Sequence, residues 1–126
     1  NSAVYINYGT KHGLPDGMGS QIFLWSALQK AAEMTQEPLD REHVTLHIKQ
    51  HPELFPAIYL AAPRSIFWPE LGLTLDERDD YILLKRIIEY FGKVNPNFTC
   101  AQVIQLLRER PAWLDINSHV KRKGNT

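Results

Sequence analysis

The sequence predicts a mixed α/β or α+β fold rather than an all-helical one, because short segments rich in β-forming residues alternate with segments of helical periodicity. We expect about four helices and three or four short strands within its 126 residues. A chain of this length can bury a core, so residues 1–126 are expected to form a single domain. So few strands leave the sheet edges exposed unless another segment or chain covers them, which suggests a missing half of the fold or an oligomer.

The first part of the chain contains two candidate strands and one candidate helix. Residues 4–8 and residues 21–25 are rich in β-formers, and residues 10–19 between them carry three glycines and a proline, which predicts a loop. Ser26 and Gln29 have the spacing of a capping box, in which each side chain binds a free backbone N–H of the first turn. A helix is therefore expected to begin at Ser26.

Proline positions delimit the middle of the chain. A helix is expected from Asp40, as its N-cap, to about residue 50, because Pro52 keeps the residue before it out of helical geometry. Residues 57–62 and residues 72–75 are further candidate strands.

Two longer helices are expected in the last part of the chain. Apolar residues at core-facing spacing predict a helix over residues 77–91, which Gly92 ends. Thr99 and Gln102 have the spacing of a second capping box, which predicts a helix over residues 100 to about 110.

Composition and charge argue against several classes of partner. The formal net charge is zero and the pI is about 7.1, so no overall field attracts nucleic acid or an anionic membrane, and we expect neither as a partner. No apolar run approaches the roughly 18 residues that span a bilayer. The single cysteine, Cys100, rules out an internal disulfide and fits a reducing cytoplasm, where we expect the protein. The polar tail at residues 121–124 is expected to be frayed.

Asp76 is the strongest candidate for a metal ligand. It lies between a predicted strand and a predicted helix and is followed by three further acids within residues 77–80, and ligands gather at the carboxyl ends of strands in α/β sheets. Carboxylate oxygens at such a point could hold Mg²⁺. The simpler interpretation is that Asp76 caps the helix and that the other acids complement its dipole, and the two interpretations are compatible for Asp76.

Arg41, Glu42 and His43 place a cation, an anion and a titratable imidazole within one predicted helical turn. Arginine can bind a carboxylate or phosphate bidentately, and histidine can exchange a proton near neutral pH. The alternative is a solvated first turn with local ion pairs. His43 is also spaced four residues from His47, and His47 four from His51, which is compatible with a zinc site or with an ordinary solvated face.

Three segments together resemble a known enzyme family in their order and spacing. They are Pro15-Asp16-Gly17-Met18, Arg41-Glu42-His43-Val44-Thr45 and Leu73-Thr74-Leu75-Asp76. This set resembles the back half of a sugar-nucleotide cytidylyltransferase, in the family named for spore-coat polysaccharide biosynthesis and related to acylneuraminate cytidylyltransferases. The resemblance extends over nearly the whole chain, from about residue 3 to residue 123.

The resemblance implies a partial Rossmann-like nucleotidyltransferase sheet with flanking helices, and a homodimer. Such enzymes use CTP and Mg²⁺ to transfer CMP to a sugar, with release of pyrophosphate. By the resemblance, Arg41, Glu42 and His43 line the sugar side of the cleft, Gln21 also lies on the substrate side, and Asp76 helps to hold Mg²⁺.

Two departures from the family pattern affect the expected activity. The nucleotide-binding loop, of the type Arg-x-x-Ser-x-Arg-Leu-Pro-Gly-Lys, is not found in this sequence, which begins at Asn1; we therefore expect the N-terminal nucleotide-binding half to be absent. Gly19 and Gln21 stand where the family has two acidic residues, and Gln21 replaces a carboxylate by a neutral amide. We expect part of a CTP-dependent sugar nucleotidylyltransferase that is inactive alone; the alternative is a non-catalytic binding or dimerisation module.

Overall fold

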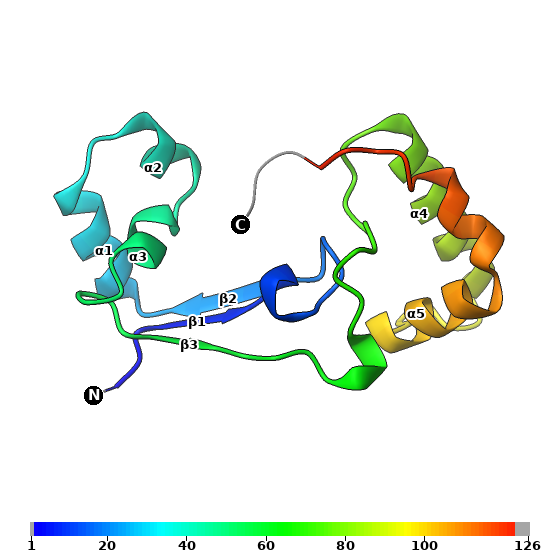
Figure 1. Cartoon of the computed structure of the whole chain (residues 1–126), viewed down its shortest axis with the longest axis horizontal. Coiled ribbons are helices and arrows are strands. Elements are labelled where there is room, and N and C mark those ends of the chain that lie inside the picture. The colour runs from blue at the N-terminus through cyan, green and yellow to red at the C-terminus, as the bar shows by residue number, and fades with distance from the viewer. Residues whose placement is uncertain (1, 123–126) are drawn as a thin grey trace.

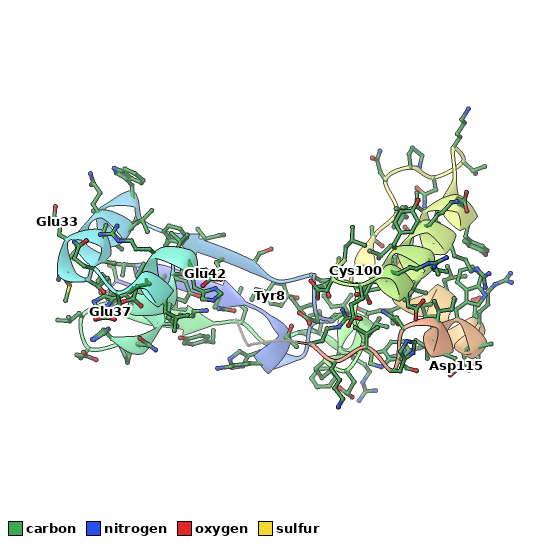
Figure 2. The ribbon with its side chains drawn as sticks, turned by 90° about the horizontal axis from the view of Figure 1, so that it is seen from above. Tyr8, Glu33, Glu37, Glu42, Cys100 and Asp115 are labelled. Carbon is green, nitrogen blue, oxygen red and sulfur yellow. The ribbon has the colours of Figure 1, made fainter. Side chains whose placement is uncertain are left out.

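The fold is mixed α/β, built on a small three-stranded mixed sheet. In this computed structural model residues 2–122 are described. Helices gather at the two ends of the sheet, α1 to α3 at one end and α4 and α5 at the other (Figure 1). Figure 2 shows the same division from above, with Glu33, Glu37 and Glu42 on one end and Cys100 and Asp115 on the other.

Strand β1 (Tyr5–Tyr8) is the central strand of the sheet, and the order is β2-β1-β3. It pairs antiparallel with β2 (Ser20–Phe23) and parallel with β3 (Ala57–Tyr59). In the register, Ile6 lies opposite both Ile22 and Ile58. The strands predicted over residues 4–8, 21–25 and 57–62 are thus confirmed, with shorter bounds.

One core lies at the end of the sheet that carries the first three helices, and its helical members come from the first and the third. The three helices are α1 (Trp25–Met34), α2 (Pro38–Glu42) and α3 (Leu46–Gln50). The buried members of this core are Tyr5, Ala27, Ala31, Ile48 and Phe55. Because Tyr5 is on the sheet and the others are on or near the helices, their burial fixes α1 and α3 on one sheet face.

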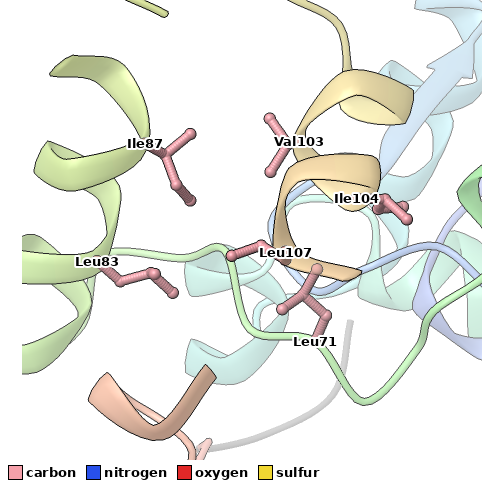
Figure 3. Close-up of a cluster of buried hydrophobic side chains, with 6 residues drawn as sticks. All are labelled: Leu71, Leu83, Ile87, Val103, Ile104 and Leu107. Carbon is pink, nitrogen blue, oxygen red and sulfur yellow. The ribbon is translucent and has the colours of Figure 1, made fainter. Parts of the chain in front are cut away.

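A second core lies between α4 (Arg78–Phe91) and α5 (Cys100–Glu109), beside the 3-10 helix Pro111–Ile116. Figure 3 shows its buried members, which are Leu71, Leu83, Ile87, Val103, Ile104 and Leu107. Both long helices were predicted within a residue of their observed starts. Gly92 ends α4 with a positive φ of 52°, which glycine adopts without a steric penalty. The capping box of Thr99 and Gln102 is present at the start of α5.

The capping box predicted at Ser26 is wrong. Helix α1 begins at Trp25 and its N-cap is Leu24, which makes no side-chain cap. The backbone N–H of Leu24 donates to the carbonyl of Val4 and its own carbonyl accepts from Ala27. The helix therefore follows directly from the end of the β1–β2 ladder, and Ser26 falls inside its first turn.

The single helix predicted from Asp40 to residue 50 is also wrong, because the structure has two short helices there. Residue His43 ends α2 in an extended conformation, with φ −109° and ψ 92°. Asp40 lies inside the first turn of α2, whose N-cap is Glu37. The break contains the β-branched pair Val44 and Thr45, which lose side-chain freedom in a helix.

Residues 72–75 do not form the predicted strand. Their only β-pairing in the described part of the chain is a single parallel bridge between Gly72 and Asp16. The neighbour that residues 72–75 meet is the loop at Asp16 and Gly17, which is not an extended strand and therefore cannot continue a ladder. Asp76 consequently follows a loop, and the N-cap of α4 is Glu77.

The tail is more ordered than predicted up to Arg122, which makes two ion pairs. Lys123 and Gly124 belonged to the same prediction, and the resemblance ends at Lys123; both residues lie outside the described part of the chain. Within residues 2–122, no helix combines the length and the apolar character needed to cross a bilayer.

Candidate functional site

A polar groove runs beside the loop that joins β1 to β2. It consists of two adjoining cavities of about 650 Å³ and about 280 Å³, which share Thr10, Asp16 and Thr74 in their walls. The smaller cavity extends to Gln21 on β2, and the larger extends to Asp76 and Arg122. The groove therefore has two ends, which we call the Gln21 end and the Asp76 end.

Gly17 lets the loop between β1 and β2 lie close to the backbone of Leu73. Its φ is +102°, and a Cβ at this position would lie 2.8 Å from the backbone carbonyl carbon and oxygen of Leu73. A side chain cannot fit at that distance, and the positive φ also disfavours other residues. Directly before this glycine the loop is tied to residues 71–73, since the backbone of Asp16 accepts from the N–H of Leu73 and donates to the carbonyl of Leu71.

The Gln21 end is organised by a hydrogen-bond network on the sheet face. The Gln21 Oε1 accepts from the Tyr5 hydroxyl at 2.7 Å and from the Thr45 hydroxyl at 2.6 Å. The Asn7 Nδ2 donates to the Tyr5 hydroxyl at 2.7 Å. Burial raises the pKa of Tyr5, so its hydroxyl stays protonated and donates to Gln21. Because both lone pairs of Oε1 are engaged, Gln21 offers a ligand chiefly its NH₂ group.

The predicted Arg41-Glu42-His43 site is not assembled around Gln21. The Arg41 Nη2 donates to the carbonyls of Ala32 and Thr35, at 2.9 Å and 3.1 Å, and so binds the C-terminal turn of α1. Glu42 and His43 are exposed. The residue of this segment that reaches Gln21 is Thr45, and the substrate roles of the other three residues stay predictions.

Sequence reasoning missed Tyr5, Asn7 and Thr45 as partners of Gln21. A signal for two of them was available, because Tyr5 and Asn7 are two residues apart on a predicted strand and must face the same side of the sheet. Thr45 carried no such signal, since its position depends on the break between α2 and α3.

The Asp76 end contains a buried ion pair that the sequence did not reveal. Asp80 is fully buried, and its carboxylate accepts from Arg122 at 2.8 Å and 2.6 Å and from the Asn117 Nδ2 at 2.9 Å. It also accepts from the backbone N–H groups of Glu77 and Asp76. The Arg122 guanidinium is the main reason that the pKa of Asp80 lies well below its usual range.

Asp76 lies beside this pair and remains accessible from the groove. Its Oδ2 accepts from the Thr74 hydroxyl at 3.0 Å and from the Arg122 Nη1 at 3.2 Å, and its side chain is 59% exposed. Arg122 is thus already the counter-ion of Asp76.

These residues do not by themselves fit a magnesium centre. In the part of the chain that the structure describes, no group of three or more His, Cys, Asp or Glu side chains could hold a metal ion. Mg²⁺ prefers several oxygen ligands in octahedral geometry, and Asp76 could contribute one carboxylate at most. The zinc interpretation required His43, His47 and His51 to lie on one helix. In the structure His43 ends α2, His47 belongs to α3 and His51 follows α3, so they do not share a helix.

Comparison with known proteins identifies relatives that are longer than this chain. No protein-family model matches the sequence. An uncharacterized protein of Methanocaldococcus jannaschii is 34% identical over 108 residues, which is 86% of this chain and 44% of that protein. The spore coat polysaccharide biosynthesis protein SpsF of Bacillus subtilis is 35% identical over 71 residues, which is 56% of this chain and 29% of that protein.

A solved structure shares the fold. A cytidylyltransferase from Leptospira borgpetersenii superposes with a TM-score of 0.81 at 22% sequence identity, over 97% of this chain and 48% of that one. The chain therefore spans less than half the length of each of these relatives. The chain is similar in sequence to part of the SpsF protein and has the fold of half of a cytidylyltransferase chain.

Proposed function

We propose that this chain is part of a CTP-dependent sugar nucleotidylyltransferase, which transfers CMP to a sugar with release of pyrophosphate, and that it is inactive alone. The observation that carries the proposal is the groove, because it connects Gln21 with Asp76 past the shared residues Thr10, Asp16 and Thr74. Its larger cavity has the volume of an ordinary small-molecule site. The sequence similarity to SpsF and the shared fold support the same conclusion.

The two ends of the groove suit different parts of such a substrate pair. The Gln21 end is lined by neutral hydrogen-bonding side chains, including Asn7, Ser20 and Gln21, which match the hydroxyl groups of a sugar. The Asp76 end includes Lys11 in its lining, and this cation suits phosphate oxygens; the other cation there, Arg122, is already paired with Asp76 and Asp80. We infer that the sugar occupies the first end and that the phosphates approach the second.

Four further parts of the proposal rest on the family resemblance. They are that the nucleotide is CTP, that Mg²⁺ binds to Asp76 together with ligands from outside this chain, that the protein is a homodimer, and that it works in the cytoplasm. Mg²⁺ would neutralise charge on the phosphates when bound.

The experiment is a chimera in which this chain replaces the matched half of the Leptospira borgpetersenii cytidylyltransferase. We expect calorimetry to detect Mg²⁺-dependent CTP binding by the chimera and none by this chain alone. Asp76→Asn should lower pyrophosphate release by about a hundredfold or more. The matched control is Asp79→Asn, because Asp79 pairs with His119 on the surface and does not line the groove. Unchanged turnover in Asp76→Asn would refute the role of Asp76, and turnover by the isolated chain would refute its incompleteness.

The second candidate is a non-catalytic binding or dimerisation module. Two observations favour it: the Arg41 guanidinium is engaged with the end of α1, and the Asp76 carboxylate is engaged with Arg122. Gln21, a neutral residue in place of an acid, also favours a non-catalytic module. A chimera that binds no CTP, while this chain forms a dimer by native mass spectrometry, would establish this alternative over the enzyme.

A further inference from the structure

We propose that a pocket between α3 and the 3-10 helix Thr10–His12 binds a dianionic phosphate group through Lys11 and Lys49. This pocket, which we call the lysine pocket, has a volume of about 270 Å³. It adjoins the groove, because Lys11 also lines the larger cavity of the groove and Asn7 the smaller one. The inference goes beyond the proposed function, since it assigns a second ligand site that needs neither CTP nor the other half of the fold.

The titratable groups that gather in the lysine pocket are basic. Lys11, His12 and Lys49 line it, and no acidic side chain is among the described residues that do. Within residues 2–122, neither lysine takes part in an ion pair. Burial lowers the pKa of Lys49, and the charge of Lys11 lowers it further, so the two ammonium groups lie close enough to repel each other. An anion between them would offset this repulsion.

The backbone that carries Lys11 and His12 is held in place by a later segment of the chain. The carbonyl of His12 accepts from the N–H of Ala62 at 2.9 Å, and the carbonyl of Gly13 accepts from the N–H of Trp68 at 2.7 Å. Gly13 ends the 3-10 helix with a φ of +113°, which glycine adopts without a steric penalty. This wall of the lysine pocket is therefore fixed before any ligand binds.

The opposite wall comes from α3, which is packed on the sheet. Figure 1 shows α3 at the end of the sheet where β1 starts, whereas the 3-10 helix follows the end of β1. Ile48 is buried in the same core as Tyr5 of β1, and this contact positions the neighbouring Lys49. Between the two walls the ring of His12 lies against that of Tyr59, with centroids 5.3 Å apart and an angle of 36° between the planes. A preorganised site of this kind loses less entropy on binding.

These donors favour a phosphate group over a carboxylate. A phosphate monoester carries a charge of about −1.5 to −2 at pH 7 and three strong acceptor oxygens, whereas a carboxylate carries a single charge. Lys11 and Lys49 supply two positive charges, each with three rotatable donors, and the imidazole of His12 supplies an N–H. The phosphate has two possible sources. It is either part of a separate small molecule or pyrophosphate that reaches the lysine pocket from the groove past Lys11.

Titration of this chain with inorganic phosphate at low ionic strength tests the site. In nuclear magnetic resonance spectra, the amide signals of His12, Lys49 and Gln50 should shift as phosphate is added, because these residues line the lysine pocket. The amide signal of Glu70, which lines only the groove, should stay in place. Acetate, a monoanion, should bind at least about tenfold more weakly than phosphate. Shifts confined to the groove, or equal binding of acetate, would overturn the proposal.

Substitutions of Lys49 separate the lysine pocket from the groove, because Lys49 lines only the former. Lys49→Met should weaken phosphate binding about tenfold by removing one charged donor, whereas Lys49→Arg should keep it within about threefold. The matched control is Lys85→Met, which removes an exposed lysine of α4 that lines neither the lysine pocket nor the groove. Equal phosphate affinities of Lys49→Met and Lys85→Met would overturn the proposal.

Thermal unfolding shows that lost binding is not lost folding. Without phosphate, Lys49→Met should melt no lower than the wild-type chain, because it removes the repulsion with Lys11. Phosphate should raise the melting temperature of the wild-type chain and of Lys85→Met, but not that of Lys49→Met at the same concentration. A phosphate-dependent rise in Lys49→Met as large as in the wild type would contradict the assignment.

Two further ligands distinguish the sources of the phosphate. Methyl phosphate that binds as tightly as inorganic phosphate would assign the site to a separate phosphorylated molecule. Pyrophosphate that binds at least about tenfold more tightly, and that also shifts the amide signal of Asp76, would assign it to pyrophosphate from the groove. Either result supports the lysine pocket as a phosphate site.

The outcomes also separate this inference from the proposed function. Phosphate binding that depends on Lys49, together with a chimera that does not bind CTP, would refute the proposed function and leave the lysine pocket in place. A chimera that binds CTP, while Lys49→Met leaves the phosphate affinity of this chain unchanged, would do the reverse.

Discussion

Arg122→Met removes the cation that neutralises the buried Asp80 carboxylate. The wild-type guanidinium makes two short contacts with Asp80, at 2.6 Å and 2.8 Å, and a longer one with Asp76. Methionine keeps much of the aliphatic length of arginine, so the change chiefly removes charge and hydrogen-bond donors. The Asp80 carboxylate, which is fully buried, would keep the Asn117 amide and two backbone N–H groups as partners.

The expected loss of stability follows from this geometry. Removing one partner of a buried ion pair costs about 3–5 kcal/mol, because the remaining charge is left without compensation. We expect the lower end, about 3 kcal/mol, since three hydrogen bonds to Asp80 remain. For a chain of 126 residues the entropy of unfolding is about 0.26 kcal/mol/K, so the melting temperature should fall by about 11 °C.

The same ion pair predicts a pH dependence. The pKa of Asp80 is lowered in the folded protein, mainly by Arg122, so below the unfolded pKa of about 3.9 the unfolded chain binds a proton that the folded chain does not. The stabilisation by Asp80 is therefore fully present above that pH and is lost as the pH falls toward the folded pKa. Arg122→Met should reduce this dependence, and its destabilisation should be smaller at pH 3 than at pH 7.

Urea denaturation of the 126-residue chain at both pH values measures these effects. Lys121→Met is the control, because it removes the same charge from the adjacent exposed residue. It should change stability by less than about 0.5 kcal/mol. A loss below about 1 kcal/mol for Arg122→Met at pH 7, or equal losses for the two variants, would refute the view that the pair with Asp80 stabilises the fold.

Three further predictions concern single side chains. A Cβ at Gly72 would clash with the Arg122 guanidinium, so Gly72→Ala should destabilise the wild-type chain but cost less in the Arg122→Met background; additive losses in urea would contradict this. Thr99→Ala should cost about 1 kcal/mol by removing the α5 cap, whereas Ser26→Ala should cost less than half of that, and equal losses would restore Ser26 as a cap. The buried His47 Nε2 has no hydrogen-bond partner in residues 2–122, so His47→Phe should raise stability by about 1 kcal/mol, and a lower melting temperature would argue against this.

The predictions that succeeded depend on interactions between residues close in sequence. Helices α4 and α5 were predicted because their apolar spacing, the stop at Gly92 and the cap at Thr99 act within one or two turns. The three strands were predicted for a similar reason, since β-forming residues stand between turn residues. Each of these signals is local, and the packing of the two cores agrees with it.

Several of the failures arose where a distant segment decides the local structure. Residues 72–75 have the sequence of a strand, yet the neighbour they meet is the loop at Asp16, so no ladder forms. The candidate site shows the same limit, because one partner of Gln21 is Thr45, 24 residues away. Asp80 was recognised only as an acid of the first helical turn, since its burial depends on Arg122, 42 residues away.

By itself, the sequence determined the mixed α/β class, the long helices and the family resemblance, because composition, periodicity and ordered motifs are properties of the chain alone. Only the tertiary structure decided that Arg41 binds the end of α1, that Asp80 rather than Asp76 is the buried acid, and that β2 is an edge strand of the sheet within residues 2–122. A side chain's charge state and partners depend on which distant groups share its desolvated surroundings, and no local pattern encodes that arrangement.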